Sequence, residues 1–179
     1  MMSNDSSLVH RDRLLEEDLN NLYESRLRDK LSAVDTVSLP SILHLVKSGR
    51  LVYTSASYKQ CTPWNTIQKS ILIESFLIDI LIPPLVFYQL DDEVDEIIDG
   101  EQRVKSIVDF LTNNFKLQGM KLWHELNGMT YDNLPSQIKE NITTNRFQTT
   151  TVLINSICDF DPEVIKQTTY ERLNDWRIT

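Results

Sequence analysis

Apolar residues recur at three- and four-residue spacing in the first part of the chain, after the polar stretch Asp5-Ser6-Ser7. This periodicity predicts a long amphipathic helix. Because no strict heptad runs along it, we expect this helix to lie on the core of its own domain, with a docking or coiled-coil arm as the alternative. We assign residues 1–36 to this extension. Its apolar positions are Leu15, Leu19, Leu22, Leu27, Leu31 and Val34.

Cap and turn residues divide the next part of the chain into short elements. Ser38-Leu39-Pro40 predicts a helix that ends at Gly49, followed by a strand over residues 51–53. Thr62-Pro63 predicts a second helix, with a threonine N-cap and proline in the first turn. This helix is apolar on several sides up to about Ile80, and we expect it to be central and largely buried.

Strand-like runs follow Pro83-Pro84. Residues 85–88 and 94–98 predict a β-hairpin. The acidic residues between them lack the regular oxygen ladder and the glycine of a calcium loop, so we interpret residues 91–93 as a solvated turn.

The second half of the chain predicts one clear helix and several shorter elements. Apolar residues at i, i+3, i+4 and i+7 from Val104 predict an amphipathic helix. An irregular stretch, a helix from Pro135, a strand over residues 146–154 and a helix over residues 161–173 follow. This order is typical of a compact α+β domain and not of a doubly wound sheet.

Composition and charge narrow the function classes. The chain has 179 residues, of which 41% are hydrophobic and 25% charged, as in a soluble globular protein of one domain. The net charge of −8 argues against a general nucleic-acid binder. The two cysteines and three scattered histidines show no zinc spacing and no disulfide framework. We therefore expect no metal site, and we expect the protein to be located in the reducing cytoplasm.

Targeting and membrane segments are not predicted. The N-terminus is polar and charged, unlike a secretory leader. The most apolar stretch, residues 71–88, contains Glu74 and Asp79 and is broken by two prolines. It therefore lacks the run of about 18 apolar residues that a transmembrane helix needs.

The strongest candidate for chemistry is the turn Asp99-Gly100-Glu101-Gln102-Arg103, between a predicted strand and a predicted helix. Glycine lets the backbone approach a ligand, and the free N–H groups and the dipole of the helix favour an anion there. Arg103 would add a planar fork for phosphate oxygens. Gln102 would orient a water or contact a base or ribose, and Asp99 would hold Mg²⁺ or polarise a water.

The same five residues also fit a purely structural interpretation. Asp99 and Gln102 have the spacing of a capping box, and Gly100 would then only allow the turn. Arg103 would pair with Glu101 or another acid on the surface. A cation in the first helical turn is unfavourable by about 0.3–1 kcal/mol unless negative charge lies beside it. Asp99 and Glu101 would supply that charge, so the residues alone leave both interpretations open.

The stretch Ile98-Asp99-Gly100-Glu101-Gln102-Arg103 and its amphipathic helix resemble the DGQQR signature. That signature belongs to the N-terminal domain of GmrSD-type (type IV) restriction proteins and of SspE-like anti-phage proteins, long described as a domain of unknown function. Similar segments lie in the family's order over residues 38–174, which is far more specific than a lone pentapeptide. They are Trp64 with Leu72-Ile73-Glu74-Ser75-Phe76, Ile82-Pro83-Pro84, Phe115-Lys116-Leu117, residues 131–135 and Tyr170-Glu171-Arg172-Leu173-Asn174.

The resemblance implies a ParB/sulfiredoxin-like α+β fold, a small mixed sheet packed with helices, in which the glycine–arginine loop binds nucleotide phosphates. It also implies binding and hydrolysis of NTP (GTP or ATP) with Mg²⁺. In full-length members this activity is coupled to a C-terminal HNH-type nuclease that acts on DNA. The residues carried over as catalytic are Asp99, Gln102 and Arg103, and those carried over as nucleotide-binding are Gly100, Glu101, Arg103, Tyr58, Lys59, Arg172 and Asn174.

The chain departs from the family pattern in three places. Tyr58-Lys59-Gln60 stands where the family has Tyr-Gln-Arg, so Lys59 would supply charge without bidentate geometry. Glu101 puts a negative charge in place of the first glutamine of the signature. The sequence ends five residues after Asn174, so we expect the domain at residues 37–179 to be truncated at its C-terminus. The chain contains no nuclease constellation.

Structural roles are assigned to Trp64 and Glu74. A buried carboxylate needs a hydrogen-bond partner or a base. One hypothesis is therefore that Glu74 braces Arg103 or Lys69, and the alternative is that it reaches solvent at the edge of its helix. For Trp123 and Trp176, packing is preferred over base stacking.

The leading hypothesis is a cytoplasmic nucleotide-binding domain, with weak NTP hydrolysis, of a DNA-targeting defence system. Hydrolysis would depend on positioning and charge stabilisation. One alternative is a non-enzymatic ParB-like module that senses nucleotide or binds DNA or a partner protein. The other is a degenerate remnant without a ligand. The missing arginine and the short C-terminus favour these two alternatives over catalysis.

Overall fold

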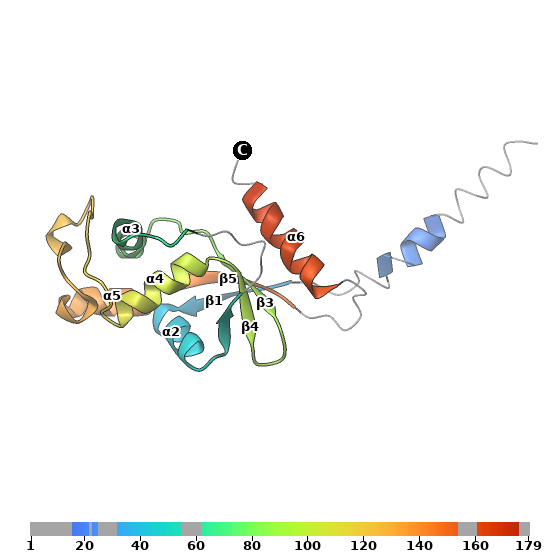
Figure 1. Cartoon of the computed structure of the whole chain (residues 1–179), viewed down its shortest axis with the longest axis horizontal. Coiled ribbons are helices and arrows are strands. Elements are labelled where there is room, and N and C mark those ends of the chain that lie inside the picture. The colour runs from blue at the N-terminus through green and yellow to red at the C-terminus, as the bar shows by residue number, and fades with distance from the viewer. Residues whose placement is uncertain (1–15, 22, 25–31, 55–61, 154–160, 176–179) are drawn as a thin grey trace, which may run out of the picture.

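A mixed five-stranded sheet forms the centre of the computed structural model, which describes residues 16–21, 23–24, 32–54, 62–153 and 161–175 (Figure 1). The strand order is β1-β5-β3-β4-β2. The β1–β5 and β3–β4 pairs are antiparallel, whereas β5–β3 and β4–β2 are parallel. The strands are β1 (Ser32–Ser38), β2 (Leu51–Tyr53), β3 (Leu85–Gln89), β4 (Asp95–Asp99) and β5 (Arg146–Val152).

Helices cover the two faces of the sheet unequally. Along β3, Leu85 and Phe87 belong to the large hydrophobic core, whereas Val86 and Tyr88 belong to a small second cluster. This alternation follows from the two-residue period of a strand. The large core includes residues of α2 (Leu39–Lys47), α3 (Thr66–Leu77), α4 (Glu101–Leu111) and α5 (Ser136–Thr144), and the small cluster packs against α6 (Pro162–Asp175).

The predicted α+β class is confirmed, together with most of its elements. Helix α2 begins after Ser38, whose side chain accepts a hydrogen bond from the Ser41 N–H. The β3–β4 hairpin, the helix that follows it, and the later helices and strand lie where their patterns predict them. In the hairpin turn, the Asp91 carboxylate accepts bonds from the Glu93 and Val94 N–H groups and stays exposed, as expected for a solvated turn. The ParB/sulfiredoxin likeness stays a prediction.

The N-cap predicted for α3 is wrong. The helix begins at Thr66, because Asn65 and Gln68 form a reciprocal capping box (2.9 and 3.0 Å). This pair satisfies two N–H groups at once, which a threonine at position 62 does not do for a helix starting four residues later. The expectation of a central and largely buried helix holds for Leu72, Ile73 and Phe76, whereas Ile67 and Ile71 are 44% and 38% exposed.

The N-terminal helix prediction is wrong at its end. Residues 16–21 and 23–24 are helical, but residues 32–38 form β1, which pairs with β5 along its whole length. The apolar spacing that includes Val34 therefore belongs to two different elements. Leu19 is 55% exposed, so the described part of the helix does not bury the apolar face that carries Leu19 against the core. Strand β1 also crosses the boundary drawn between residues 36 and 37.

The segment between α4 and α5 is irregular, as expected, and contains the short turns η1 (His124–Leu126) and η2 (Tyr131–Asn133). Four buried side chains fasten it to the core: Leu117, Met120, Leu126 and Leu134. None of the helices described here has the length and the apolar run that a bilayer crossing requires.

Candidate functional site at the N-terminal end of α4

The turn from β4 into α4 depends on Gly100. Its φ of +98° lies in the left-handed region, and a Cβ there would lie 2.3 Å from the Cδ2 atom of Leu85. Gly100 is the N-cap of α4, and no side chain makes the cap hydrogen bond. The predicted capping box of Asp99 and Gln102 is therefore wrong. Both side chains have other partners.

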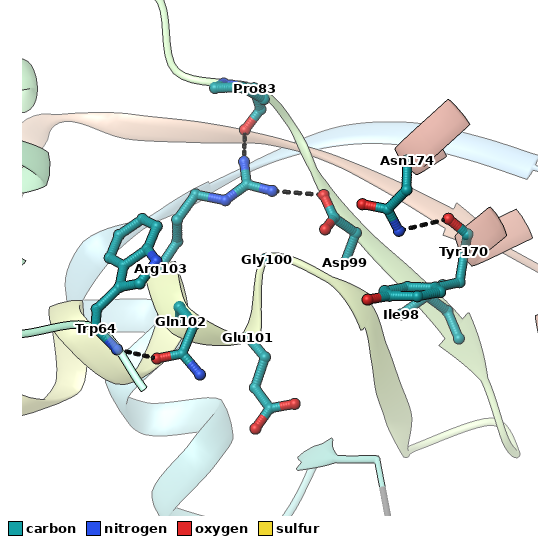
Figure 2. A pocket seen from close by; sticks show the side chains of 10 residues that line it. All are labelled: Trp64, Pro83, Ile98, Asp99, Gly100, Glu101, Gln102, Arg103, Tyr170 and Asn174. Atoms are coloured by element: carbon teal, nitrogen blue, oxygen red, sulfur yellow. Dashed lines mark hydrogen bonds and ion pairs between the residues drawn. The ribbon is translucent and has the colours of Figure 1, made fainter. Parts of the chain in front are cut away.

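Arg103 is buried behind this turn, with 6% of its surface exposed. Its guanidinium donates to Asp99 Oδ2 (2.7 Å) and to the carbonyl oxygens of Pro83 and Pro84. The structural interpretation paired Arg103 with Glu101 or another acid on the surface. The partner is the nearby acid Asp99, but this pair is buried, and Glu101 pairs with Lys105 instead. The planar fork thus links the end of β4 to the segment before β3 (Figure 2).

Gln102 links α4 to the segment that precedes α3. Its Oε1 atom accepts a hydrogen bond from the Trp64 N–H at 3.0 Å (Figure 2). This bond satisfies a backbone donor ahead of the capping box of α3. Gln102 therefore connects α4 to a residue that is 38 positions away in the sequence.

A cavity of about 390 Å³ opens at this point. It brings together Trp64, the five residues of the turn and Asn174, all of which were predicted from the sequence. Asn174 donates its side-chain N–H to the Tyr170 carbonyl (2.8 Å) and lies with Tyr170 on α6, across the turn from Trp64 (Figure 2). The lining residues are Trp64, Pro83, Ile98, Asp99, Gly100, Glu101, Gln102, Arg103, Tyr170 and Asn174.

One predicted nucleotide contact is not brought into this cavity. Arg172 is exposed and does not line it, because two residues along a helix from Asn174 correspond to a rotation of about 200°. Tyr58 and Lys59 lie outside the described residues. Conversely, Tyr170 was not predicted as a site residue, although it begins the family-like stretch that ends at Asn174.

Glu74 has a role that the sequence did not predict. Its carboxylate accepts three hydrogen bonds, from the backbone N–H groups of Lys121, Leu122 and Trp123 (3.1, 2.7 and 2.9 Å). Both earlier hypotheses are wrong, because Glu74 is 5% exposed and Lys69 pairs with Asp109 instead. Burial by itself raises the pKa of Glu74, but the three N–H donors outweigh it and hold the pKa below its ordinary value.

Among the described residues that line the cavity, each acid has a basic partner. Arg103 offsets Asp99, and Lys105 offsets Glu101. Lys105 Nζ also lies 4.9 Å from the centre of the Tyr53 ring. Burial, with the nearby acids Asp109 and Glu101, raises the pKa of Tyr53. Within the described ranges, no three histidine, cysteine or acidic residues come together as a metal site.

Comparison with known proteins assigns the sequence to a family. No curated protein and no solved structure matches the chain. The sequence model of the GmrSD restriction endonuclease N-terminal domain matches residues 42–178, which include the whole cavity wall. The chain therefore belongs to the family of GmrSD restriction endonuclease N-terminal domains.

Proposed function

We propose that this chain is the nucleotide-binding domain of a restriction-like defence protein and holds a nucleoside triphosphate in the cavity at the N-terminal end of α4. The observation that carries the proposal is the buried guanidinium of Arg103, a residue of the first turn of α4 that lines the cavity. Buried cations and helix N-termini both stabilise phosphate oxygens. The volume of about 390 Å³ falls in the range of small-molecule sites.

Because both acids on the cavity wall are paired with basic side chains, we infer that the nucleotide binds together with Mg²⁺. A triphosphate would meet the Asp99 and Glu101 carboxylates, and it gains little from Arg103 while Asp99 neutralises that residue. Mg²⁺ is commonly held by one or two carboxylates together with substrate phosphates. Asp99 fits this role, and it would release Arg103 to the phosphate oxygens as it takes the metal.

The other residues of the cavity would contact different parts of the ligand. Backbone N–H groups after Gly100 would contact the phosphates, and the amide nitrogen of Gln102 would contact ribose or orient water. DNA contact would fall to a partner or to a C-terminal nuclease domain. Such a domain would act in the cytoplasm, where nucleotides and foreign DNA meet.

A second candidate function is a sensor that binds nucleotide without turnover. It is favoured by one observation: Arg103 is the one cationic side chain among the described residues that line the cavity. Phosphoryl transfer to water depends on stabilising charge at several oxygens, and a single arginine that shares its charge with Asp99 supports binding better than hydrolysis.

Calorimetry with GTP and ATP, in Mg²⁺ and in EDTA, tests the proposal together with a phosphate-release assay. Arg103→Lys keeps the charge but cannot span Asp99 and Pro83, so we expect at least a tenfold loss of affinity. Arg146→Lys is the matched control, because Arg146 is exposed on β5 and bonds Thr36; its affinity should stay within twofold. Turnover that is lost in Arg103→Lys supports the enzyme, and binding without turnover supports the sensor. If neither nucleotide binds, the chain is a remnant and the proposal is wrong.

A further inference from the structure

Helix α6 forms one wall of the cavity but packs on the opposite face of the sheet from the large core. The apolar cluster that holds it contains three buried residues, Val86, Tyr88 and Ile98. Residues of α6 that pack against this cluster are Ile165, Tyr170 and Leu173. This cluster is much smaller than the core on the other face, so polar contacts carry more weight in fixing where α6 lies.

One such contact is a buried ion pair between α6 and β4. Lys166 is 6% exposed, and its Nζ atom lies 2.8 Å from Glu96 Oε2 and 5.6 Å from the centre of the Tyr88 ring. It also pairs with Glu163, one turn earlier on α6. Burial by itself lowers the pKa of Lys166, but the hydrogen bonds and charges of Glu163 and Glu96 raise it to about 12. The lysine therefore stays charged.

The two acids differ in what they connect. Glu163 is on the same helix as Lys166, and its side chain is 65% exposed, so this pair does not link α6 to the sheet. Glu96 is on β4, and its side chain is 9% exposed. Removing one member of a buried pair leaves an uncompensated charge, whereas an exposed pair contributes little. Of these two pairs, the one with Glu96 links α6 to the sheet.

The ion pair lies in line with the cavity wall. Lys166, Tyr170 and Asn174 are four residues apart, so they share one face of α6 and lie about 6 Å apart along its axis. On the sheet, Glu96 lies three residues before Asp99 on the strand that leads into the turn. The Lys166–Glu96 pair thus joins α6, which forms one wall of the cavity, to β4, which leads into the turn at Gly100.

We propose that Lys166 is a positioning residue, which through Glu96 holds α6 where Tyr170 and Asn174 contact the nucleoside part of the ligand. The inference rests on the proposed nucleotide site. The Tyr170 ring offers a stacking surface for a base, and the Asn174 side-chain oxygen points away from its bond to Tyr170 (Figure 2). The phosphates bind at the turn, which α6 does not form.

The test compares a nucleotide with a ligand that lacks a base. Affinities of the whole chain for GTP, ATP and inorganic tripolyphosphate, each with Mg²⁺, are measured by calorimetry. In Glu96→Gln, the affinity for whichever nucleotide binds the wild type is expected to fall at least tenfold. The affinity for tripolyphosphate should stay within twofold of the wild-type value. Glu163→Gln is the matched control, since it removes the pair within α6 alone, and both affinities should stay within twofold. An equal loss for nucleotide and tripolyphosphate, or no loss, overturns the proposal.

Hydrogen exchange of the ligand-free protein separates this inference from the nucleotide proposal. In Glu96→Gln, the amides of α6 should exchange at least tenfold faster while those of α4 keep their rates, and Glu163→Gln should match the wild type. If the wild type binds no nucleotide, the nucleotide proposal and the ligand part of this inference fail together. Unchanged exchange in α6 overturns the positioning role by itself. Should Glu96→Gln not fold, Lys166→Gln keeps a donor for Glu96 and must show the same pattern.

Discussion

The guanidinium of Arg103 donates to the carboxylate of Asp99 at 2.7 Å, and both side chains face the same cavity. The side chains of Arg103 and Asp99 are 8% and 12% exposed, so solvent screens the attraction between them only weakly. Any phosphate that binds here competes with Asp99 for Arg103. The behaviour of the site should therefore depend on how this pair is broken.

Asp99→Asn should separate phosphate binding from metal dependence. Asparagine still accepts a hydrogen bond but carries no charge, so Arg103 becomes available to an anion. We expect tripolyphosphate affinity in EDTA to rise several-fold, and the gain that Mg²⁺ confers on nucleotide binding to shrink. Loss of a charged hydrogen bond should lower the free energy of unfolding by about 1.5–3 kcal/mol. Calorimetry in EDTA and in Mg²⁺ measures the first two effects, and equal Mg²⁺ dependence in both proteins would rule out Asp99 as the metal ligand.

Gly100→Ala should destabilise the fold more than the same change elsewhere. The added methyl group would meet Leu85 Cδ2 at 2.3 Å, in a backbone conformation with φ of +98°. Gly49 also has a positive φ (+74°), but a Cβ there meets nothing within 4 Å. Gly49→Ala should therefore cost about 1–2 kcal/mol for the backbone alone. Gly100→Ala should cost about 1–3 kcal/mol more for overpacking against the core, as measured by urea unfolding.

Glu74→Gln should lower stability and remove one source of its pH dependence. A pKa held below the ordinary value of 4.5 means that the stabilising effect is fully present above about pH 4.5 and is lost as the pH falls through the lower folded value. At pH 7 the substitution should lower the free energy of unfolding by about 1–3 kcal/mol, because it weakens the bonds that the buried Glu74 side chain accepts from three backbone N–H groups. The cost should shrink below pH 4.5 in urea unfolding. The matched control is Glu125→Gln, at an exposed residue of the segment that carries the three N–H donors, and it should leave stability unchanged both at pH 7 and below pH 4.5.

Gln102 substitutions should separate a structural role from a ligand role. Gln102→Ala leaves the Trp64 N–H without its acceptor and should lower the free energy of unfolding by about 1 kcal/mol. Gln102→Glu keeps an acceptor for that N–H but adds a negative charge to the cavity. We expect near-native stability with at least tenfold weaker nucleotide binding. If Gln102→Glu binds nucleotide as tightly as the wild type, the side chain does not face the ligand. Chemical unfolding followed by Trp fluorescence and calorimetry provide the two readouts.

Elements whose signals are local were predictable from the sequence alone. The i, i+3, i+4 pattern from Val104 located α4, the alternation and prolines around Leu85 located the hairpin, and Ser38 located the start of α2. These signals work because helix and strand periodicities and caps involve residues within about one turn of each other. The turn from Asp99 to Arg103 was identified in the same way, and its similarity to a known signature named the family.

The partners of those residues depend on tertiary packing. Glu74 accepts its bonds from residues 47 to 49 positions away, and the Asp99–Gln102 spacing suggested a capping box that does not form. Strand β1 exists because β5 pairs with it, although its apolar residues fit a helix. The cavity itself needs Tyr170 and Asn174 of α6, which lie more than 60 positions after the turn in sequence. Packing across such separations is a property of the whole chain, and local spacing carries no information about it.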